Sequence, residues 1–363
     1  MNHTMISEGL RIFHYSMCKK MLGIPSYKGN SEQICQEIIK RCWTGSYFMT
    51  SSGHFCQFYT RDFAWCTRPL IRLGHKESVH KTLGYALSRF SKKKKVTVAI
   101  SPGGNAFDFP TYAVDSLPYL IYSLVESNEE ELAEQYRTFL EKELERFVSL
   151  VVDKKTGLVK QGHFSSAKDH SIRQSSCYDT TMVALLSSNL DKLGLNNPLK
   201  RYDYKKLIIK NYWNGHAFMD DMSKNAVISG DANVFPFWCG TINDKERLTS
   251  SINTLKTIGL DKPLPLKYTS SRQNTISMDV LTPNFQGDTI WTYLGLLFIN
   301  NVSKVDPRMA LYYLVKYGRL IEEQGNLLEV LDPQGRPYSS AFYLTDDSML
   351  WASIYLELVQ RLK

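Results

Sequence analysis

The sequence has no run of about 18 apolar residues, so we expect no transmembrane helix among its 363 residues. Its first residues, MNHTMISEGLRIF, contain no basic segment followed by an apolar one, and no secretory signal peptide is predicted. The seven cysteines form no CxxC pair and show none of the spacings of zinc ligands. Unpaired thiols in apolar segments are typical of a reducing compartment. We therefore predict a cytoplasmic protein that does not bind a membrane.

A strong excess of one charge is also absent, because 44 Lys and Arg face 36 Asp and Glu. The one dense basic segment, Lys92 to Lys95, is interpreted as a solvated loop, and no nucleic-acid partner is expected. The eight histidines include no HxxxH or HxH pair, and the two DD pairs lie in MDDM and TDDS rather than in DDxxD. We expect no metal and no other cofactor.

What the sequence does contain is a sixfold pattern with a period of about 57 residues. Six segments start with Asp and continue into a stretch that is apolar on nearly all sides, which is typical of a buried helix. They start at Asp62, Asp115, Asp179, Asp231, Asp288 and Asp347. Because an Asp carboxylate accepts hydrogen bonds from the first-turn N–H groups, we interpret these residues as helix caps.

Amphipathic, charged segments alternate with the apolar ones and predict outer, solvated helices. They cover about 31–43, 77–90, 129–150, 201–213, 244–258 and 307–323. Twelve alternating helices in six hairpins predict an all-α fold, the (α/α)6 barrel, as one domain over 1–363 with 1–25 as an N-terminal extension. The only strand signal is a short hairpin at Val96–Ile100. The long connections all lead into inner helices, and we expect the functional site on that face.

The loop before the first inner helix places Arg61 and Asp62 beside Tyr59 and Trp65. Two opposite charges next to aromatic surface suit a clamp on the vicinal hydroxyls of a sugar. The alternative is a helix cap with a structural ion pair.

The third loop is polar and dense in functional groups, with Asp169, His170, Arg173, Tyr178 and Asp179. A Ser-His-Asp hydrolase built from Ser165, His163 and Asp169 is disfavoured because the sequence has no GxSxG elbow. In the sixth loop, Glu329 lies among apolar residues, which would raise its pKa.

Asp169 and Glu329 come from loops halfway around a six-hairpin ring, so both can face one cavity. Glycoside hydrolysis uses such a pair, with one acid for the leaving oxygen and one carboxylate for the water; a wide separation would make the enzyme inverting. The fourth and fifth loops offer further candidates for a sugar subsite, although the tryptophans fit a helix core equally well. These candidates are Trp238, Phe285, Gln286, Asp288 and Trp291.

Four segments resemble motifs of the six-hairpin glycosidases, which include glucoamylase, the glucosidase domain of glycogen debranching enzyme, trehalase, mannosylglycerate hydrolase and neutral invertase. YTRDFAW is similar to the segment that binds the non-reducing sugar, and AFYLTDDSMLWASIYLEL is similar to the closing helix. KDHSIRQSSCYD resembles the general-acid segment, and NLLEVLDPQGRP resembles the stretch with the general base. The resemblance covers about residues 30–362.

This resemblance implies that Asp169 is the general acid, with Arg173 as its companion and Tyr178 and Asp179 lining the site, and that Glu329 is the general base. We include His163 of the third loop among the candidate substrate contacts. The expected function is inverting hydrolysis of an α-glucoside or another small α-glycoside. The alternatives are a sugar epimerase or lyase with His163, His170 or His216 as base, and a carbohydrate-binding protein without activity.

Overall fold

The structure is a computed structural model that describes all residues except 1–2, 163, 170, 224–225 and 271–280. The described backbone is mainly helical, and the strands in it are two residues long. Among the described helices, none is both long and apolar enough to span a lipid bilayer.

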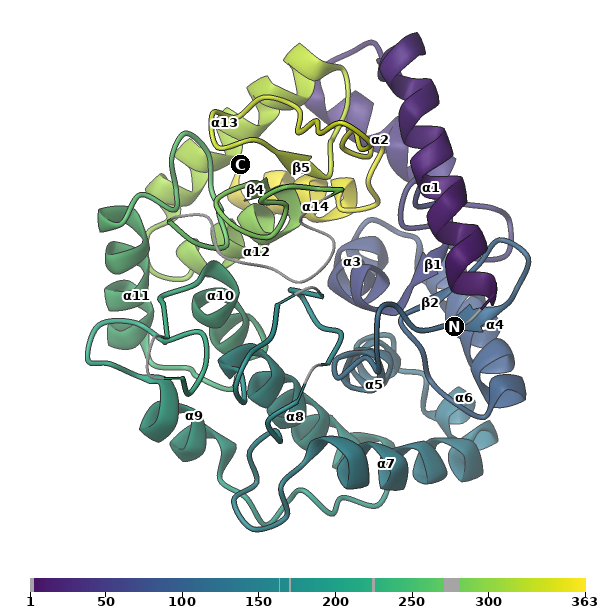
Figure 1. Ribbon diagram of the computed structural model, residues 1–363, viewed down its shortest axis with the longest axis vertical. Helices are drawn as coiled ribbons and strands as arrows, with labels where there is room; N and C mark the ends of the chain where they lie inside the picture. Colours follow the sequence, from purple (N-terminus) through teal and green to yellow (C-terminus); the bar gives the residue numbers. More distant parts are fainter. Residues whose placement is uncertain (1–2, 163, 170, 224–225, 271–280) are drawn as a thin grey trace.

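Six helices form an inner ring around a common axis (Figure 1). They are α3 (Thr60–Arg72), α5 (Ser116–Glu126), α8 (Cys177–Leu190), α10 (Gly230–Trp238), α12 (Thr292–Val302) and α14 (Ala352–Leu362). Each packs against the next, and α14 packs against α3, so the ring is closed. Almost every residue of α8 and α12 is buried, which explains why these segments are apolar on all sides.

An outer layer of helices surrounds this ring (Figure 1). It consists of α2 (Ser31–Cys42), α4 (Lys76–Lys93), α6 (Glu130–Gln135), α7 (Arg137–Val151), α9 (Tyr204–Tyr212), α11 (Lys245–Thr257) and α13 (Pro307–Gln324). The single helix expected over 129–150 is divided into α6 and α7, because Tyr136 between them leaves helical geometry (φ −106°, ψ 13°). The predicted (α/α)6 barrel is confirmed.

The aspartates at the helix starts do not act as the expected caps. Asp115 directly precedes α5 but makes no capping hydrogen bond, and α8 is capped by Ser176 rather than by Asp179. Asp231 lies inside α10 and accepts a 2.8 Å hydrogen bond from Arg173. The capping interpretation is wrong at these positions, and the carboxylates of Asp115 and Asp231 instead bind arginines of neighbouring hairpins.

Two inner helices begin later than their aspartates. After Asp288, the chain forms strand β4 (Ile290–Trp291), which pairs antiparallel with β5 (Val330–Leu331) before α12 starts. Asp347 lies in the loop that leads to α14, and its carboxylate pairs with Lys19. The loops on this face therefore hold structure that the helical repeat does not predict.

A second small sheet lies on the same face of the barrel. Strands β1 (Phe58–Tyr59), β2 (Ala99–Ile100) and β3 (Ala106–Phe107) are antiparallel and ordered β1-β2-β3. The hairpin expected near residues 96–100 is part of it. Phe58 lies opposite Ile100, which brings the loops that lead to α3 and α5 side by side.

The N-terminal extension folds into a long helix, α1 (His3–Leu22), outside the two layers. In Figure 1 it lies along the side of the barrel near β1 and β2. Lys19 of α1 forms buried ion pairs with Asp346 (2.9 Å) and with Asp347. Gly53 packs against these three groups so closely that a Cβ atom would collide with them. These buried ion pairs attach α1 to the loop before α14.

Candidate active site

A cavity of about 200 Å³ lies between α1 and the N-terminal ends of the inner helices. Its walls combine acidic groups with many apolar and aromatic side chains. The charged side chains among its described lining residues are those of Glu8, Arg61, Asp62, Asp169 and Glu329. This volume lies below the range of about 300–1,000 Å³ typical of sites for drug-sized molecules, so the site suits a small ligand.

Arg61 connects the cavity to the interior of the barrel. It lies in the first turn of α3, where its Nε donates a 2.8 Å hydrogen bond to Asp115 and its Nη2 lies 3.2 Å from Asp169. Asp115 also accepts a 2.8 Å hydrogen bond from the hydroxyl of Tyr178. The guanidinium group is therefore held between two carboxylates from the loops before the second and third inner helices.

Asp169 faces the cavity at the outer end of this network. Besides the pair with Arg61, its Oδ1 accepts a 2.5 Å hydrogen bond from Ser165. The Ser165 N–H is bound to the carbonyl of Tyr112, which ties the third loop to the second. The carboxyl group of Asp169 is the more accessible member of the ion pair, with side-chain exposures of 19% for Asp169 and 10% for Arg61.

Asp62 lies one residue after Arg61 and accepts a 3.0 Å hydrogen bond from Nε1 of Trp351. Burial raises the pKa of Asp62 to about 7, although the nearby guanidinium of Arg61 opposes the shift. A carboxyl group with this pKa is present in both its protonated and its ionised form near pH 7. It can therefore donate a hydrogen bond to a hydroxyl group or accept one from it.

Glu329 enters the cavity from the sixth loop and is held by both main chain and side chain. Strand β5 follows directly and pairs with β4, and the Glu329 carbonyl accepts a hydrogen bond from the N–H of Thr292. Its Oε2 accepts a 2.5 Å hydrogen bond from the Tyr343 hydroxyl and a 3.1 Å bond from the N–H of Asp346. Burial raises the pKa of Glu329 to about 8, although both hydrogen bonds favour its ionised form.

A second layer of polar groups lies behind Tyr343. Nε2 of His54 lies 3.0 Å from the Tyr343 hydroxyl, and Nδ1 lies 3.2 Å from Oδ1 of Asp346. Burial lowers the pKa of His54 to about 4, so the imidazole is neutral at pH 7. The same Asp346 carboxylate binds Lys19, and α1 is thereby connected to the surroundings of Glu329.

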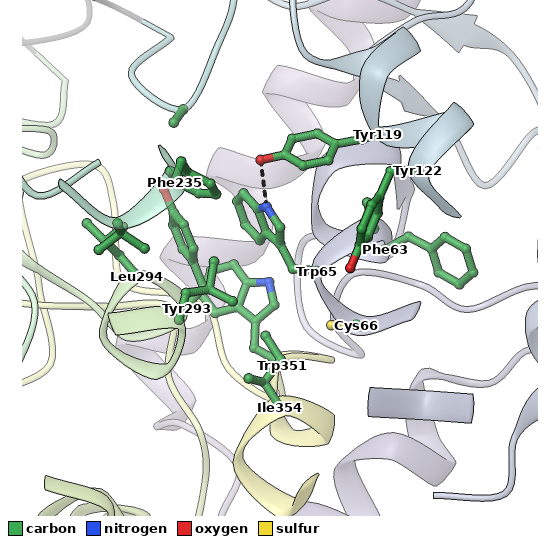
Figure 2. Close-up of a cluster of buried hydrophobic side chains, with 14 of the residues drawn as sticks. Phe63, Trp65, Cys66, Tyr119, Tyr122, Phe235, Tyr293, Leu294, Trp351 and Ile354 are labelled. Carbon is green, nitrogen blue, oxygen red and sulfur yellow. Dashed lines mark hydrogen bonds between the residues drawn. The ribbon is translucent and has the colours of Figure 1, made fainter. Parts of the chain in front are cut away.

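Stacked aromatic rings form the floor of the cavity. Trp65 lies parallel to Tyr293 with 4.0 Å between ring centroids, and Trp351 lies beside both (Figure 2). Nε1 of Trp65 donates a 2.9 Å hydrogen bond to Tyr119, drawn as the dashed line in Figure 2. These rings come from α3, the start of α12 and the residue before α14, so the floor is part of the barrel core.

We call the part of the lining that comes from α1 and from the loop between α4 and α5 the roof. It consists of Met5, Gly9, Ile12, Phe13, Val98, Phe107 and Phe109. Val98 and Phe107 belong to a small apolar cluster against which Met5, Tyr59 and Phe109 pack. The roof also carries Glu8, whose carboxylate lies 3.0 Å from Arg11 and accepts a 2.6 Å hydrogen bond from Gln57.

Most of the residues proposed from the sequence meet at this cavity. The lining includes both carboxyl candidates and seven of the expected substrate contacts, namely Asp169, Glu329, Tyr59, Arg61, Asp62, Trp65, Phe285, Gln286 and Trp291. His163 lies outside the described residues.

The remaining candidates lie elsewhere. Arg173 binds Asp220 and Asp231 rather than Asp169, so it supports the third and fourth loops instead of accompanying the general acid. Tyr178 is buried behind Asp115, and Asp179 is buried in the first turn of α8 with its pKa raised to about 6 by burial.

Trp238 and Asp288 also lie outside the cavity lining. Trp238 is at the far end of α10, where it is partly buried and packs against Tyr122 and Phe235. Asp288 accepts a hydrogen bond from Asn284 within its own loop.

The sequence interpretation missed the whole of α1 and many further side chains of the cavity. The missed aromatic residues outside α1 are Phe55, Phe107, Phe109, Tyr293, Tyr343 and Trp351, and the others are Thr50, Val98, Ala167, Thr282 and Met349. Trp351 and Tyr343 lie in the C-terminal motif that resembles the closing helix, and this motif was the available signal. Nothing in α1 distinguishes its cavity residues, because its apolar positions resemble those of any amphipathic helix.

No family model and no curated protein matches the chain. Solved structures with the same fold do match, at low identity. A glycosidase variant in complex with glucose has 13% identity and a TM-score of 0.62, covering 92% of this chain and 96% of its own. The GH63 mannosylglycerate hydrolase from Thermus thermophilus, in complex with Tris and D-glycerate, has 11% identity and a TM-score of 0.64, covering 91% and 100%. The rhamnosidase from Klebsiella oxytoca with rhamnose bound has 10% identity and a TM-score of 0.63, covering 93% and 65%.

Proposed function

We propose that this protein is a glycoside hydrolase that acts on an α-glucoside or another small α-glycoside by an inverting mechanism. The observation that carries the proposal is that Asp169 and Glu329, from the third and sixth hairpins, line one small cavity. Hydrolysis of a glycosidic bond needs a carboxylic acid for the leaving oxygen and a carboxylate for the attacking water. The similarity of the fold to solved glycosidases supports the same conclusion.

In this proposal the floor of the cavity binds the sugar ring. Arg61 and Asp62 supply a donor and an acceptor for its hydroxyl groups, and Gln286 adds an amide. The rings of Trp65 and Trp291 offer apolar surface for the carbon–hydrogen faces of the sugar, with Tyr59 at the edge. Two of the similar structures hold a monosaccharide, glucose in one and rhamnose in the other.

The resemblance of the sequence motifs assigns Asp169 as the acid and Glu329 as the base, and we adopt this assignment. One observation favours the reverse: with a pKa near 8, most of Glu329 is protonated at pH 7, as a proton donor would be. The two assignments predict opposite dependence on pH.

A histidine-based epimerase or lyase has less support. Among the described lining residues of the cavity there is no histidine. His216 lines a separate surface depression together with Lys245 and Ser250. His163 and His170 lie outside the described residues.

The test is a screen of the purified protein against α-glucosides, α-mannosides, α-rhamnosides, trehalose, sucrose and glycosylglycerates, with the released anomer followed by NMR. We expect release of a free sugar with inverted configuration. Asp169→Asn and Glu329→Gln should each lower kcat by about 100-fold or more, while the exposed control Glu77→Gln should not. Retention of full activity by both folded variants contradicts the proposal, and oligosaccharide binding without turnover identifies a binding protein instead.

A further inference from the structure

We propose that the roof of the cavity binds the aglycone of the substrate, and that this aglycone is a compact, uncharged, apolar group such as an aryl or short alkyl chain. The inference rests on the proposed function and names its substrate class. It follows from the chemistry of the roof, the charges in the cavity and the anchoring of α1.

The two sides of the cavity differ in chemistry. Beside the aromatic floor, Asp62, Arg61 and Asp169 can exchange hydrogen bonds with sugar hydroxyls. The roof presents the side chains of Met5, Ile12 and Phe13 from α1, and those of Val98, Phe107 and Phe109 from the loop between α4 and α5. A leaving group that points from the floor towards α1 therefore meets mainly carbon.

The polar group of the roof is already engaged. The Glu8 carboxylate is bound by Arg11 of its own helix and by the side-chain amide of Gln57. Apolar surface of the roof that a ligand covers is removed from water, which favours binding of an apolar group. A hydroxylated leaving group would find few replacement hydrogen bonds among these carbon-rich side chains for the hydration that it loses, which disfavours it.

The charges of the cavity exclude an acidic aglycone. Its described lining includes four carboxyl groups, those of Glu8, Asp62, Asp169 and Glu329, against the single guanidinium of Arg61. That guanidinium is bound by Asp115 and Asp169, both within hydrogen-bonding distance. A carboxylate such as glycerate, which the structurally similar mannosylglycerate hydrolase holds, would find no unpaired cation among the described lining residues of this cavity.

The roof is anchored, so it limits the size of the leaving group. Lys19 pairs with two buried carboxylates, Arg11 donates a 2.8 Å hydrogen bond to the carbonyl of His54, and the Ser16 hydroxyl accepts a hydrogen bond from the N–H of Leu344. With α1 held at these points, a cavity of about 200 Å³ leaves room for one sugar and a short group.

The experiment compares the binding of non-hydrolysable 1-thio-α-glycosides to the wild-type protein by titration calorimetry, for glucose, mannose and rhamnose. Two matched pairs isolate the aglycone: phenyl against methyl for apolar area, and propyl against 2-carboxyethyl for charge. For at least one sugar, phenyl should bind at least about 10-fold more tightly than methyl, and propyl at least about 10-fold more tightly than 2-carboxyethyl. Equal affinities within either pair, preference for the carboxylate, or no binding of any thioglycoside overturns the inference.

Substitutions in α1 test whether the aglycone binds against this helix. Met5→Ser and Ile12→Ser should each reduce the phenyl-over-methyl preference, and together abolish most of it. Leu10→Ser is the matched control, because Leu10 lies on the same helix with 67% exposure. A preference that survives the double variant, shown to be folded by thermal unfolding, overturns the placement. Tight phenyl binding without hydrolysis of the corresponding O-glycosides would contradict the proposed function, and only the binding of an apolar group by the roof would then be supported.

Discussion

The hydroxyl of Tyr343 donates a 2.5 Å hydrogen bond to Oε2 of Glu329. Both residues belong to the segment between α13 and α14, where the N–H of Glu329 is also bound to the carbonyl of Asp346. His54 approaches the same hydroxyl from the loop before α3. The orientation of the candidate base is thus determined by groups from the first and the last hairpin.

Removal of this hydrogen bond should make Glu329 harder to ionise. In Tyr343→Phe the ionised carboxylate loses a donor while its burial remains, so the pKa of Glu329 should rise further above 8. With Glu329 as the base, the pH at which kcat/KM is half-maximal should move upwards, and kcat/KM at pH 7 should fall about 10-fold. A pH series of initial rates measures both quantities.

Tyr338→Phe is the matched control for this variant. The Tyr338 hydroxyl donates to the carbonyl of Pro283, away from Glu329. Its loss should leave the pH midpoint unchanged. Equal midpoints for wild type and Tyr343→Phe would show that the hydrogen bond does not influence the catalytic carboxyl.

The pH dependence of the wild-type enzyme should distinguish the two assignments of roles. A general base works in its ionised form, so with Glu329 as base kcat/KM should rise with pH through a midpoint near 8 and level off above it. With Glu329 as the acid, kcat/KM should instead fall as pH passes 8. A profile from pH 5 to 10 on the best substrate gives the sign directly, and a profile without a midpoint between 7 and 9 would remove Glu329 from both roles.

Arg61→Met should destabilise the barrel strongly. The substitution leaves the buried carboxylate of Asp115 without its cation, and the loss of one partner from a buried pair typically costs about 3–5 kcal/mol. Denaturant unfolding measures the free energy of unfolding. In the control Arg68→Met, the half-exposed partner of Glu126 is lost, with an expected cost below about 1 kcal/mol. Similar losses in the two variants would mean that Arg61 has no special structural role.

Lys19→Met should release α1 from the loop before α14. The carboxylates of Asp346 and Asp347 would remain buried without their ammonium partner, which favours separation of the helix. We expect cleavage of α1 in limited proteolysis to accelerate at least about 10-fold, measured by mass spectrometry of the fragments. Lys20→Met, which removes hydrogen bonds to main-chain carbonyls only, should accelerate cleavage much less. Unchanged protection in Lys19→Met would contradict this account of the anchoring.

The arrangement of the helices was predictable because the distribution of apolar residues around a helix reflects which of its sides are buried. Segments such as the one that forms α12 are apolar on every side, whereas α2 and α11 have one charged face, and this contrast separates the inner from the outer layer. The cavity positions of Asp169 and Glu329 follow from their loops, since long connections on one face of a ring converge.

The partners of these side chains could not be predicted in the same way. Asp115 fits a helix cap by local rules, but its carboxylate binds Arg61 from another hairpin. Strands of two residues, such as β4 and β5, are too short for an alternating pattern to be visible. The contribution of α1 depends on where a helix outside the repeat docks, which is determined by the pairing of Lys19 with residues more than 300 positions away.

That long-range pairing has a consequence for how the protein is made. Lys19 and Asp346 are separated by 327 positions, and α14 must pack against α3 to close the ring. During synthesis the first helices leave the ribosome long before their final neighbours exist. The cavity combines side chains of α1 with Glu329, so it is completed only after the segment that carries Glu329 and Asp346 has been synthesised. Deletion of α14, which leaves the ring open between α12 and α3, should yield a chain without a binding site, rather than a weakened one.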